Sequence, residues 1–122
     1  PVWQADELWA LHRQGHDGIA IAGNPNAPAA LLMVIARRGQ TSSMLRYQLS
    51  RSPQITPEIE AFVLANDRGG SDKLTLLDNP QLSCPTLLSL ATDPDPQVAQ
   101  RARDAVGQRE GAGRGCAAKG GS

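Results

Sequence analysis

The sequence predicts an all-α fold made of short two-helix repeats stacked on one another. Two series of prolines with a period of about 28 residues carry this prediction. Each member of the first series follows Asn or Ser, and each member of the second stands just before an apolar run. The first series is Pro25, Pro53 and Pro80, and the second is Pro28, Pro57 and Pro85. Self-similarity at such a period is typical of a repeat array.

Each repeat is expected to contain a helix, a turn and a second, shorter helix. Proline has no N–H and a fixed φ, so it suits the first position of a helix, and Asn or Ser satisfies backbone groups in the preceding turn. The apolar residues recur at three- and four-residue spacings, as on the buried stripe of a helix. We therefore expect about eight short helices and no sheet. The predicted core residues are Leu31, Leu32, Ile35, Ala36, Leu45 and Leu49 in the second unit, Ile59, Phe62, Val63, Leu64, Leu74 and Leu77 in the third, and Leu87, Leu88, Leu90, Ala91, Val98, Ala102 and Ala105 in the last.

The two ends of the chain depart from the repeat. At the start, Leu8, Trp9 and Leu11 can face inward from a helix that begins near Asp6, and a shorter helix is expected over 19–22. Terminal repeats must cover an open core, and the two tryptophans, Trp3 and Trp9, are suited to that role. At the other end the Gly-rich sequence predicts a flexible tail. The predicted division is one helical repeat domain over 1–106, with repeats near 1–23, 24–51, 52–78 and 79–106, and a tail over 107–122.

Two of the units resemble a known family. NPNAPAALLMVIA, from Asn24, and NPQLSCPTLLSLATDPDPQVAQRA, from Asn79, are similar to the leucine-rich repeat variant, a helical solenoid related to HEAT repeats. The resemblance implies a short right-handed α-solenoid of about four two-helix repeats, and it brings no fixed catalytic residues. Some family members carry a cysteine-rich iron–sulfur module, which two cysteines cannot hold alone. The third unit departs from the pattern, because Ser52 replaces Asn and 66–70 replaces the Asp-Pro-Asp-Pro turn.

Charge is segregated along a chain whose formal net charge is zero. Four arginines and no acid occupy 37–57, and the acidic residues then gather in 58–78. The two segments can be ordinary solvated faces, partly salt-bridged between neighbouring repeats, or a charged docking surface. The candidate partner-binding residues are Arg37, Arg38, Arg46, Arg51, Trp3 and Trp9.

Metal binding and thiol chemistry have little support in the sequence. His12 and His16 are four residues apart, as in half of a zinc site, but Gly15 weakens the helix between them and no third ligand is evident. Cys84 and Cys116 lack CxxC spacing. A disulfide between them would need the tail to fold back, so we expect two unpaired thiols and, with them, a reducing compartment.

These patterns favour a non-catalytic scaffold for protein–protein interaction or an accessory subunit of a larger assembly. Stacked repeats present one long curved surface, and no catalytic residues or cofactor are indicated. The alternative is a nucleic-acid-binding repeat protein that uses the arginine-rich segment, which the zero net charge and the scarcity of aromatic residues disfavour. No apolar run reaches the ~20 residues of a membrane span, and we expect a cytoplasmic location, although a cleaved signal peptide would leave no trace.

Overall fold

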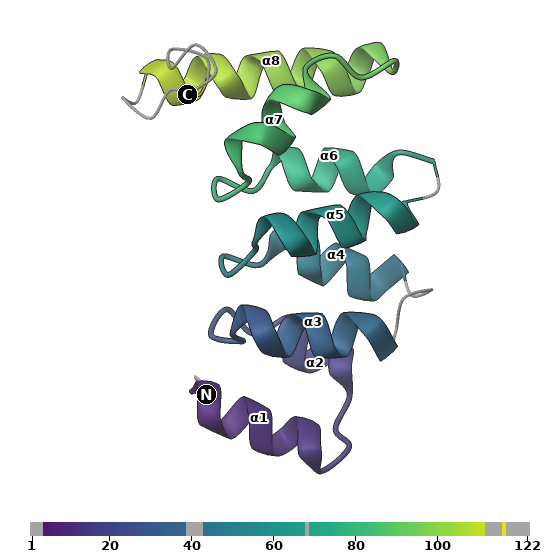
Figure 1. The fold of residues 1–122 in the computed structure, drawn as a ribbon, viewed down its shortest axis with the longest axis vertical. Coiled ribbons are helices and arrows are strands. Elements are labelled where there is room, and N and C mark those ends of the chain that lie inside the picture. Colours follow the sequence, from purple (N-terminus) through teal and green to yellow (C-terminus); the bar gives the residue numbers. More distant parts are fainter. Residues whose placement is uncertain (1–3, 39–42, 68, 112–115, 117–122) are drawn as a thin grey trace.

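The computed structural model describes residues 4–38, 43–67, 69–111 and 116, and over these residues the chain is entirely helical (Figure 1). Eight α-helices and no strand occur in this part of the chain, which confirms the prediction from the apolar spacing. The helices are α1 (Ala5–Arg13), α2 (Gly18–Ala22), α3 (Ala29–Arg38), α4 (Ser43–Arg51), α5 (Pro57–Asn66), α6 (Ser71–Leu77), α7 (Cys84–Leu90) and α8 (Pro96–Gly111).

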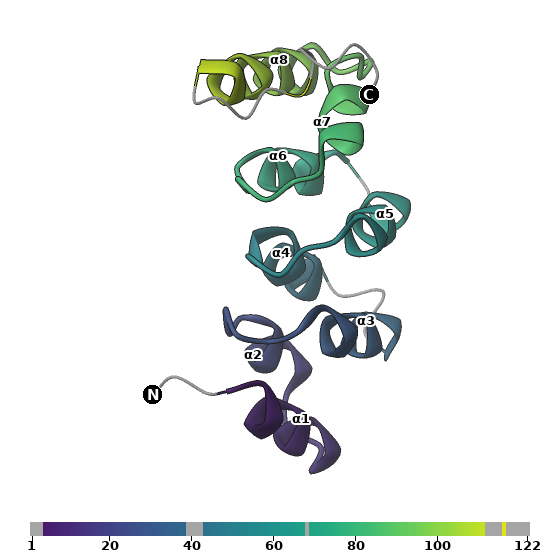
Figure 2. The same ribbon diagram turned by 60° about the vertical axis from the view of Figure 1, so that its left-hand side comes forward.

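The helices follow one another along the long axis of the molecule, from α1 at one end to α8 at the other (Figure 1). Turned by 60°, the ribbon shows α2, α4 and α6 in one column and α3, α5 and α7 in a second (Figure 2). In the first column α2 packs on α4 and α4 packs on α6, and in the second α3 packs on α5. The last helix of the first column, α6, also packs on α8. Each helix therefore contacts elements close to it in the sequence, and most of the buried apolar residues form one connected core.

Proline sets the beginnings of the later helices, as the sequence predicts. Pro57 is the first residue of α5, and the Thr56 hydroxyl caps that helix by accepting a hydrogen bond from the Ile59 N–H at 3.3 Å. Pro85 lies in the first turn of α7, and Pro96 begins α8. These positions need no N–H donor, so the ring costs the helix nothing there.

The three turns that carry the first proline series share one hydrogen-bond pattern. In each turn the polar side chain before the proline accepts from the backbone N–H two residues later, as in an Asx turn. The bonds run from Asn26 N to Asn24 Oδ1 (3.0 Å), from Gln54 N to Ser52 Oγ (3.1 Å) and from Gln81 N to Asn79 Oδ1 (2.9 Å). The residue three positions after each polar residue is buried, and these residues are Ala27, Ile55 and Leu82. The hydroxyl of Ser52 thus reproduces the turn that asparagine makes elsewhere.

Most of the predicted core residues are buried, and the prediction is wrong for one of them, Leu88. Leu88 exposes 38% of its surface, while Leu87 and Leu90 of the same helix are buried. Successive residues of an α-helix are about 100° apart, so the short helix α7 cannot turn all three leucines toward its neighbours. Of the other predicted core residues, Phe62, Leu64, Leu74, Ala91 and Ala105 are only partly buried at the edge of the core. The turn residues Ala27, Ile55 and Leu82, and Leu76 of α6, add core that the pattern missed.

Helices α1 and α2 lie where the sequence predicts a helix from near Asp6 and a shorter one over 19–22. Leu8 is buried, and Trp9 and Leu11 pack against the core from its edge. Trp3 lies outside the described residues, so its predicted covering role stays a prediction.

The last helix is longer than predicted, because α8 continues through Gly111 where a flexible tail was expected from Gly107. Arg109 explains the difference. Its guanidinium donates to the carbonyl oxygens of Leu82, at 2.7 Å, and of Pro80, at 3.3 Å, and the residue is 9% exposed. These bonds hold the last turn of α8 against the turn that precedes α7, so the helix persists despite its glycines.

Candidate functional site

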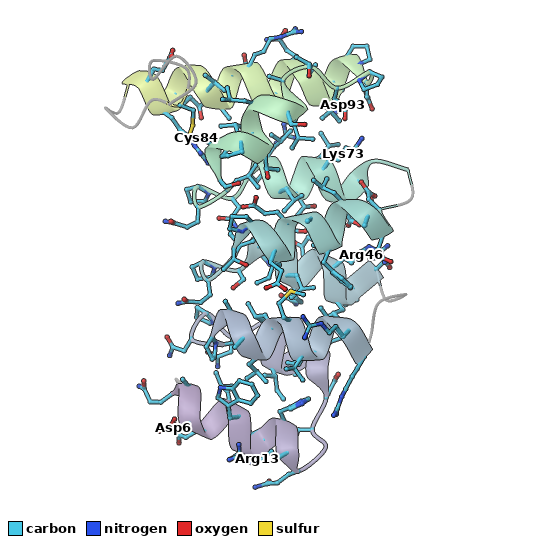
Figure 3. The ribbon with its side chains drawn as sticks, viewed as in Figure 1. Asp6, Arg13, Arg46, Lys73, Cys84 and Asp93 are labelled. Atoms are coloured by element: carbon cyan, nitrogen blue, oxygen red, sulfur yellow. A yellow bond between two sulfur atoms is a disulfide. The ribbon has the colours of Figure 1, made fainter. Side chains whose placement is uncertain are left out.

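The four candidate arginines lie in different surroundings, and Arg46 is buried in an ion pair. Its Nε lies 2.7 Å from Asp72 Oδ2, and the two side chains are only 9% and 8% exposed. The pair connects α4 to α6, and Figure 3 shows Arg46 about half-way along the long axis, at the right-hand side. Arg46 is therefore buried in an ion pair within the protein and does not contribute to an exposed binding surface.

Arg37 also meets an acid, but on the surface. Its Nη2 is 3.4 Å from Glu58 Oε2, and both side chains are 65% exposed. Ion pairs at this exposure contribute only about 0–1 kcal/mol. Both bridges link the basic segment to the acidic one, so salt bridges between packed helices, α3 with α5 and α4 with α6, account for Arg37 and Arg46.

Arg51 stands on an exposed face of α4. Its guanidinium carbon lies 5.2 Å from the centre of the Tyr47 ring, in cation–π geometry. Tyr47 is 42% exposed and Met44, one turn earlier, is 55% exposed. Because residues three and four apart share a side of a helix, Met44, Tyr47, Gln48 and Arg51 form one stripe, which we call the α4 face.

A hollow adjoins the α4 face where the helix meets two of the proline turns. It has a volume of about 190 Å³ and is lined by Gln48 and Arg51 together with 22–25 and 52–53. The α4 face therefore combines an exposed aromatic ring, a thioether, a guanidinium and a small recess. Tyr, Met and Arg are the residue types that protein–protein interfaces favour.

Arg38 lies in a different place, at the end of α3. It lines a pocket of about 300 Å³ with His12 and His16, over a floor that includes Ile35 and Leu45. The pocket therefore combines two imidazoles and a guanidinium with the carboxylate of Asp17 and with apolar side chains. No group of three His, Cys, Asp or Glu side chains close enough to hold a metal ion occurs in the described part of the chain.

Trp9 lies at the side of another hollow, of about 570 Å³, between α1, α3 and the start of α5. Met33 and Val34 form part of this hollow, and Arg37 and Glu58 stand at it. The Trp9 ring also meets His12 edge-on, with 6.3 Å between ring centroids. The predicted binding residues are thus only partly brought together, since Trp9 and Arg37 line one hollow while Arg51 and Arg38 line two others.

The structure also contains polar links that the sequence analysis missed. Glu60 is 1% exposed, and its carboxylate accepts hydrogen bonds from the Ser83 N–H (2.8 Å), the Ser83 hydroxyl (2.6 Å) and the Thr86 hydroxyl (2.6 Å). Asn79 is buried and donates through Nδ2 to the carbonyl oxygens of Ser50 and Ser52, at 2.8 and 2.9 Å. Glu60 directly follows Ile59, a residue of the predicted buried stripe, and this position was a hint that Glu60 is buried. Its partners lie more than 20 residues away in the sequence, so no local pattern could identify them.

A further ion pair joins α6 to the turn before α8. Lys73 Nζ lies 2.7 Å from Asp93 Oδ2, and the two side chains point toward each other in Figure 3. The hydrogen bond from Lys73, helped by the Asp95 N–H, lowers the pKa of Asp93. The same bond raises the pKa of Lys73 above its ordinary value. The pair therefore favours the charged form of both groups.

The cysteines are joined, which corrects the expectation of two unpaired thiols. Cys84, the first residue of α7, and Cys116 form a disulfide with 5.4 Å between their Cα atoms. The Arg109 bonds to Leu82 and Pro80 place the end of α8 beside the turn before α7, and the sequence did not show this proximity. The argument for a reducing compartment rested on unpaired thiols and no longer holds.

Comparisons with known proteins give this chain no relative. No protein-family model, no curated protein and no solved structure matches it. In the described part of the chain, none of the helices has the length and apolar character that crossing a bilayer requires.

Proposed function

We propose that the chain is a short right-handed α-solenoid of about four two-helix repeats, of the leucine-rich repeat variant kind, and that it serves as a non-catalytic scaffold or accessory subunit. The repeated turn geometry at Asn24, Ser52 and Asn79 supports the repeat assignment, as do the two columns of helices (Figure 2). A stack of this kind presents a continuous side surface, which suits it to hold another protein chain.

The observation that carries the proposal is the α4 face. Exposed large apolar residues are few in the described part of the chain, namely Met44, Tyr47 and Leu88, and two of them lie on this face beside Arg51. The guanidinium of Arg51 lies over the Tyr47 ring, and this contact lowers the rotamer entropy that is lost when a carboxylate binds it. We expect the partner to be a protein segment that places an Asp or Glu on Arg51 and an apolar side chain between Met44 and Tyr47.

Protein is favoured over nucleic acid by the fate of the arginines. Arg46 is buried against Asp72, and Arg37 faces Glu58, so two of the four are already opposed by carboxylates of the chain itself. The zero net charge also gives little general attraction for a polyanion.

A peptide array tests the proposal with a defined probe. The full chain is applied to 15-residue peptides that contain Asp or Glu beside apolar residues, and to matched peptides with Asn or Gln in place of the acids. We expect binding to the acidic members, lost in Arg51→Glu and reduced at least about tenfold in Tyr47→Ala, since central Tyr and Arg residues carry most of the energy of an interface.

Two control variants define the outcome. Arg103→Glu reverses an exposed arginine on α8, and Leu88→Ala removes an exposed leucine on α7; neither should change binding. Equal binding to acidic and amide peptides, or equal loss in the control variants, would refute the α4 face as the docking surface. Binding of a single-stranded oligonucleotide that weakens steeply with salt would instead favour the nucleic-acid alternative.

A further inference from the structure

The Cys84–Cys116 disulfide has two unequal ends. Cys84 begins α7 and is half-buried, whereas Cys116 is 5% exposed. Figure 3 shows Cys84 at the side of the stack, below the end of α8. The Cys84 end of the disulfide is therefore the more exposed to an approaching thiol.

A cation lies beside the buried end of the disulfide. Arg109 Nη1 lies 3.8 Å from the Sγ of Cys116. The same guanidinium is fixed by its bonds to the carbonyl oxygens of Leu82 and Pro80. A guanidinium held next to a sulfur stabilises the thiolate that forms when the disulfide breaks, and a better-stabilised thiolate leaves faster in thiol–disulfide exchange.

We propose that this disulfide is a thiol-exchange site, at which an incoming thiolate attacks Sγ of Cys84 and Cys116 leaves as a thiolate held by Arg109. The natural co-reactant class is a dithiol. Its first thiolate gives an electron pair to Cys84 Sγ and forms a mixed disulfide, while the electrons of the old bond depart with Cys116 Sγ. The second thiol of the reductant then loses its proton and attacks the reductant's first sulfur, which is bonded to Cys84 in the mixed disulfide. The reductant becomes an intramolecular disulfide. Cys84 is released and takes up a proton, so two electrons pass from the dithiol to the protein.

The exchange would modify one end of the molecule. The disulfide ties the chain beyond α8 to the start of α7, across 32 residues of sequence. After reduction, the last turn of α8 keeps its Arg109 bonds to the turn at 80–82 but loses its covalent tie. Exchange therefore acts on the surface formed by α7 and α8, and the α4 face is not part of this change.

The site of attack is tested on the unaltered chain. The oxidised protein is treated briefly with glutathione, a monothiol that leaves the mixed disulfide in place, then quenched in acid and digested. We expect the glutathione adduct on Cys84 to exceed that on Cys116 by about tenfold. Cys84 is the more exposed end, and attack there releases Cys116, which is the better leaving group. An adduct mainly on Cys116, or equal amounts on both, overturns the proposal.

The role of Arg109 needs a second measurement. We expect Arg109→Gln to slow reduction by dithiothreitol several-fold, Arg109→Lys to restore much of the rate, and Arg103→Gln, on an exposed residue of the same helix, to leave it unchanged. A merely structural role for Arg109 predicts the opposite sign, since a loosened end is reduced faster. In a Cys84→Ser background, alkylation of Cys116 should also shift to higher pH when Arg109 becomes Gln. A rate that is unchanged or raised in Arg109→Gln rules out Arg109 as the stabilising group.

Discussion

The two ends of the stack are held together by different kinds of contact. Among the residues that the structure describes, the contacts within the region from α1 to α3 are mainly apolar, and Leu8, Ile21, Leu31 and Leu32 are nearly inaccessible to solvent. The region from α4 to α8 adds specific polar and covalent links between successive layers (Figure 3). These links are the Arg46–Asp72 pair, the Glu60 and Asn79 hydrogen bonds, the Lys73–Asp93 pair, the Arg109 bonds and the disulfide.

The difference shows that the helices are held together with different geometric specificity in the two regions. Apolar contacts tolerate small changes in the angle between layers, whereas a buried carboxylate with three donors accepts one arrangement. The α4–α8 region is therefore expected to be the more rigid part of the stack. The hollows lined by Arg38 and by Trp9 both flank α1, in the region where the contacts between helices are mainly apolar.

The largest effect is expected from breaking the buried ion pair of the α4–α8 region. Arg46→Met leaves the carboxylate of Asp72 without its buried partner and should cost about 3–5 kcal/mol of unfolding free energy. The double variant Arg46→Met with Asp72→Leu removes both charges and should recover most of that loss. Urea denaturation measures both, with Arg103→Met as an exposed control. If the single variant is as stable as the unaltered chain, the polar links do not hold this region.

Apolar packing in the α1–α3 region is tested by Leu32, which is fully buried in α3. Leu32→Ala should destabilise the protein by about 2–5 kcal/mol, through lost burial and the cavity that remains. Leu88→Ala provides the matched control, because 38% of Leu88 is already exposed. Its cost should stay below about 1 kcal/mol. Similar melting-temperature shifts in the two variants would contradict the placement of these leucines.

Loss of the disulfide should affect one end of the stack more than the other. Reduction, or Cys84→Ser with Cys116→Ser, removes a constraint across 32 residues and should cost about 2–4 kcal/mol. Native-state hydrogen exchange locates the change. Amides of α7 and α8 should exchange faster while those of α3 keep their protection. Uniform loss of protection along the whole chain would show that the stack unfolds as a single unit and that the regional comparison fails.

The smallest expected effect is a pH dependence from the Lys73–Asp93 pair. The lowered pKa of Asp93 gives stability that is complete above its unfolded value, near 3.8, and is lost as pH falls through the folded value. The raised pKa of Lys73 gives stability that is complete below 10.5 and is lost as pH rises through the folded value. The contribution should be flat between these limits and within about 1 kcal/mol. Asp93→Asn should remove it, and a stability curve unchanged at both pH extremes would show that the pair is not formed in solution.

Local features of the chain were predictable from the sequence. The helix beginnings at Pro57, Pro85 and Pro96 follow from the fixed φ and missing N–H of proline, which act within one turn. Buried residues such as Leu32 and Val63 follow from the 3.6-residue period, because a helix presents the same side to its neighbours at every turn. The miss at Leu88 marks the limit of that period in a helix of two turns.

The candidate site depended on contacts that no local pattern encodes. Arg46 and Arg51 lie on the same helix, yet one is buried against Asp72 and the other stacks on Tyr47 in solvent. Their difference is set by where α6 lies, and Asp72 is 26 residues from Arg46 in the sequence. The same holds for Arg109 and Cys116, which act on a turn and a helix start about 30 residues earlier. Charge and thiol partners are chosen by proximity in space, and here only the stacking of the helices brought those side chains within a few ångströms of one another.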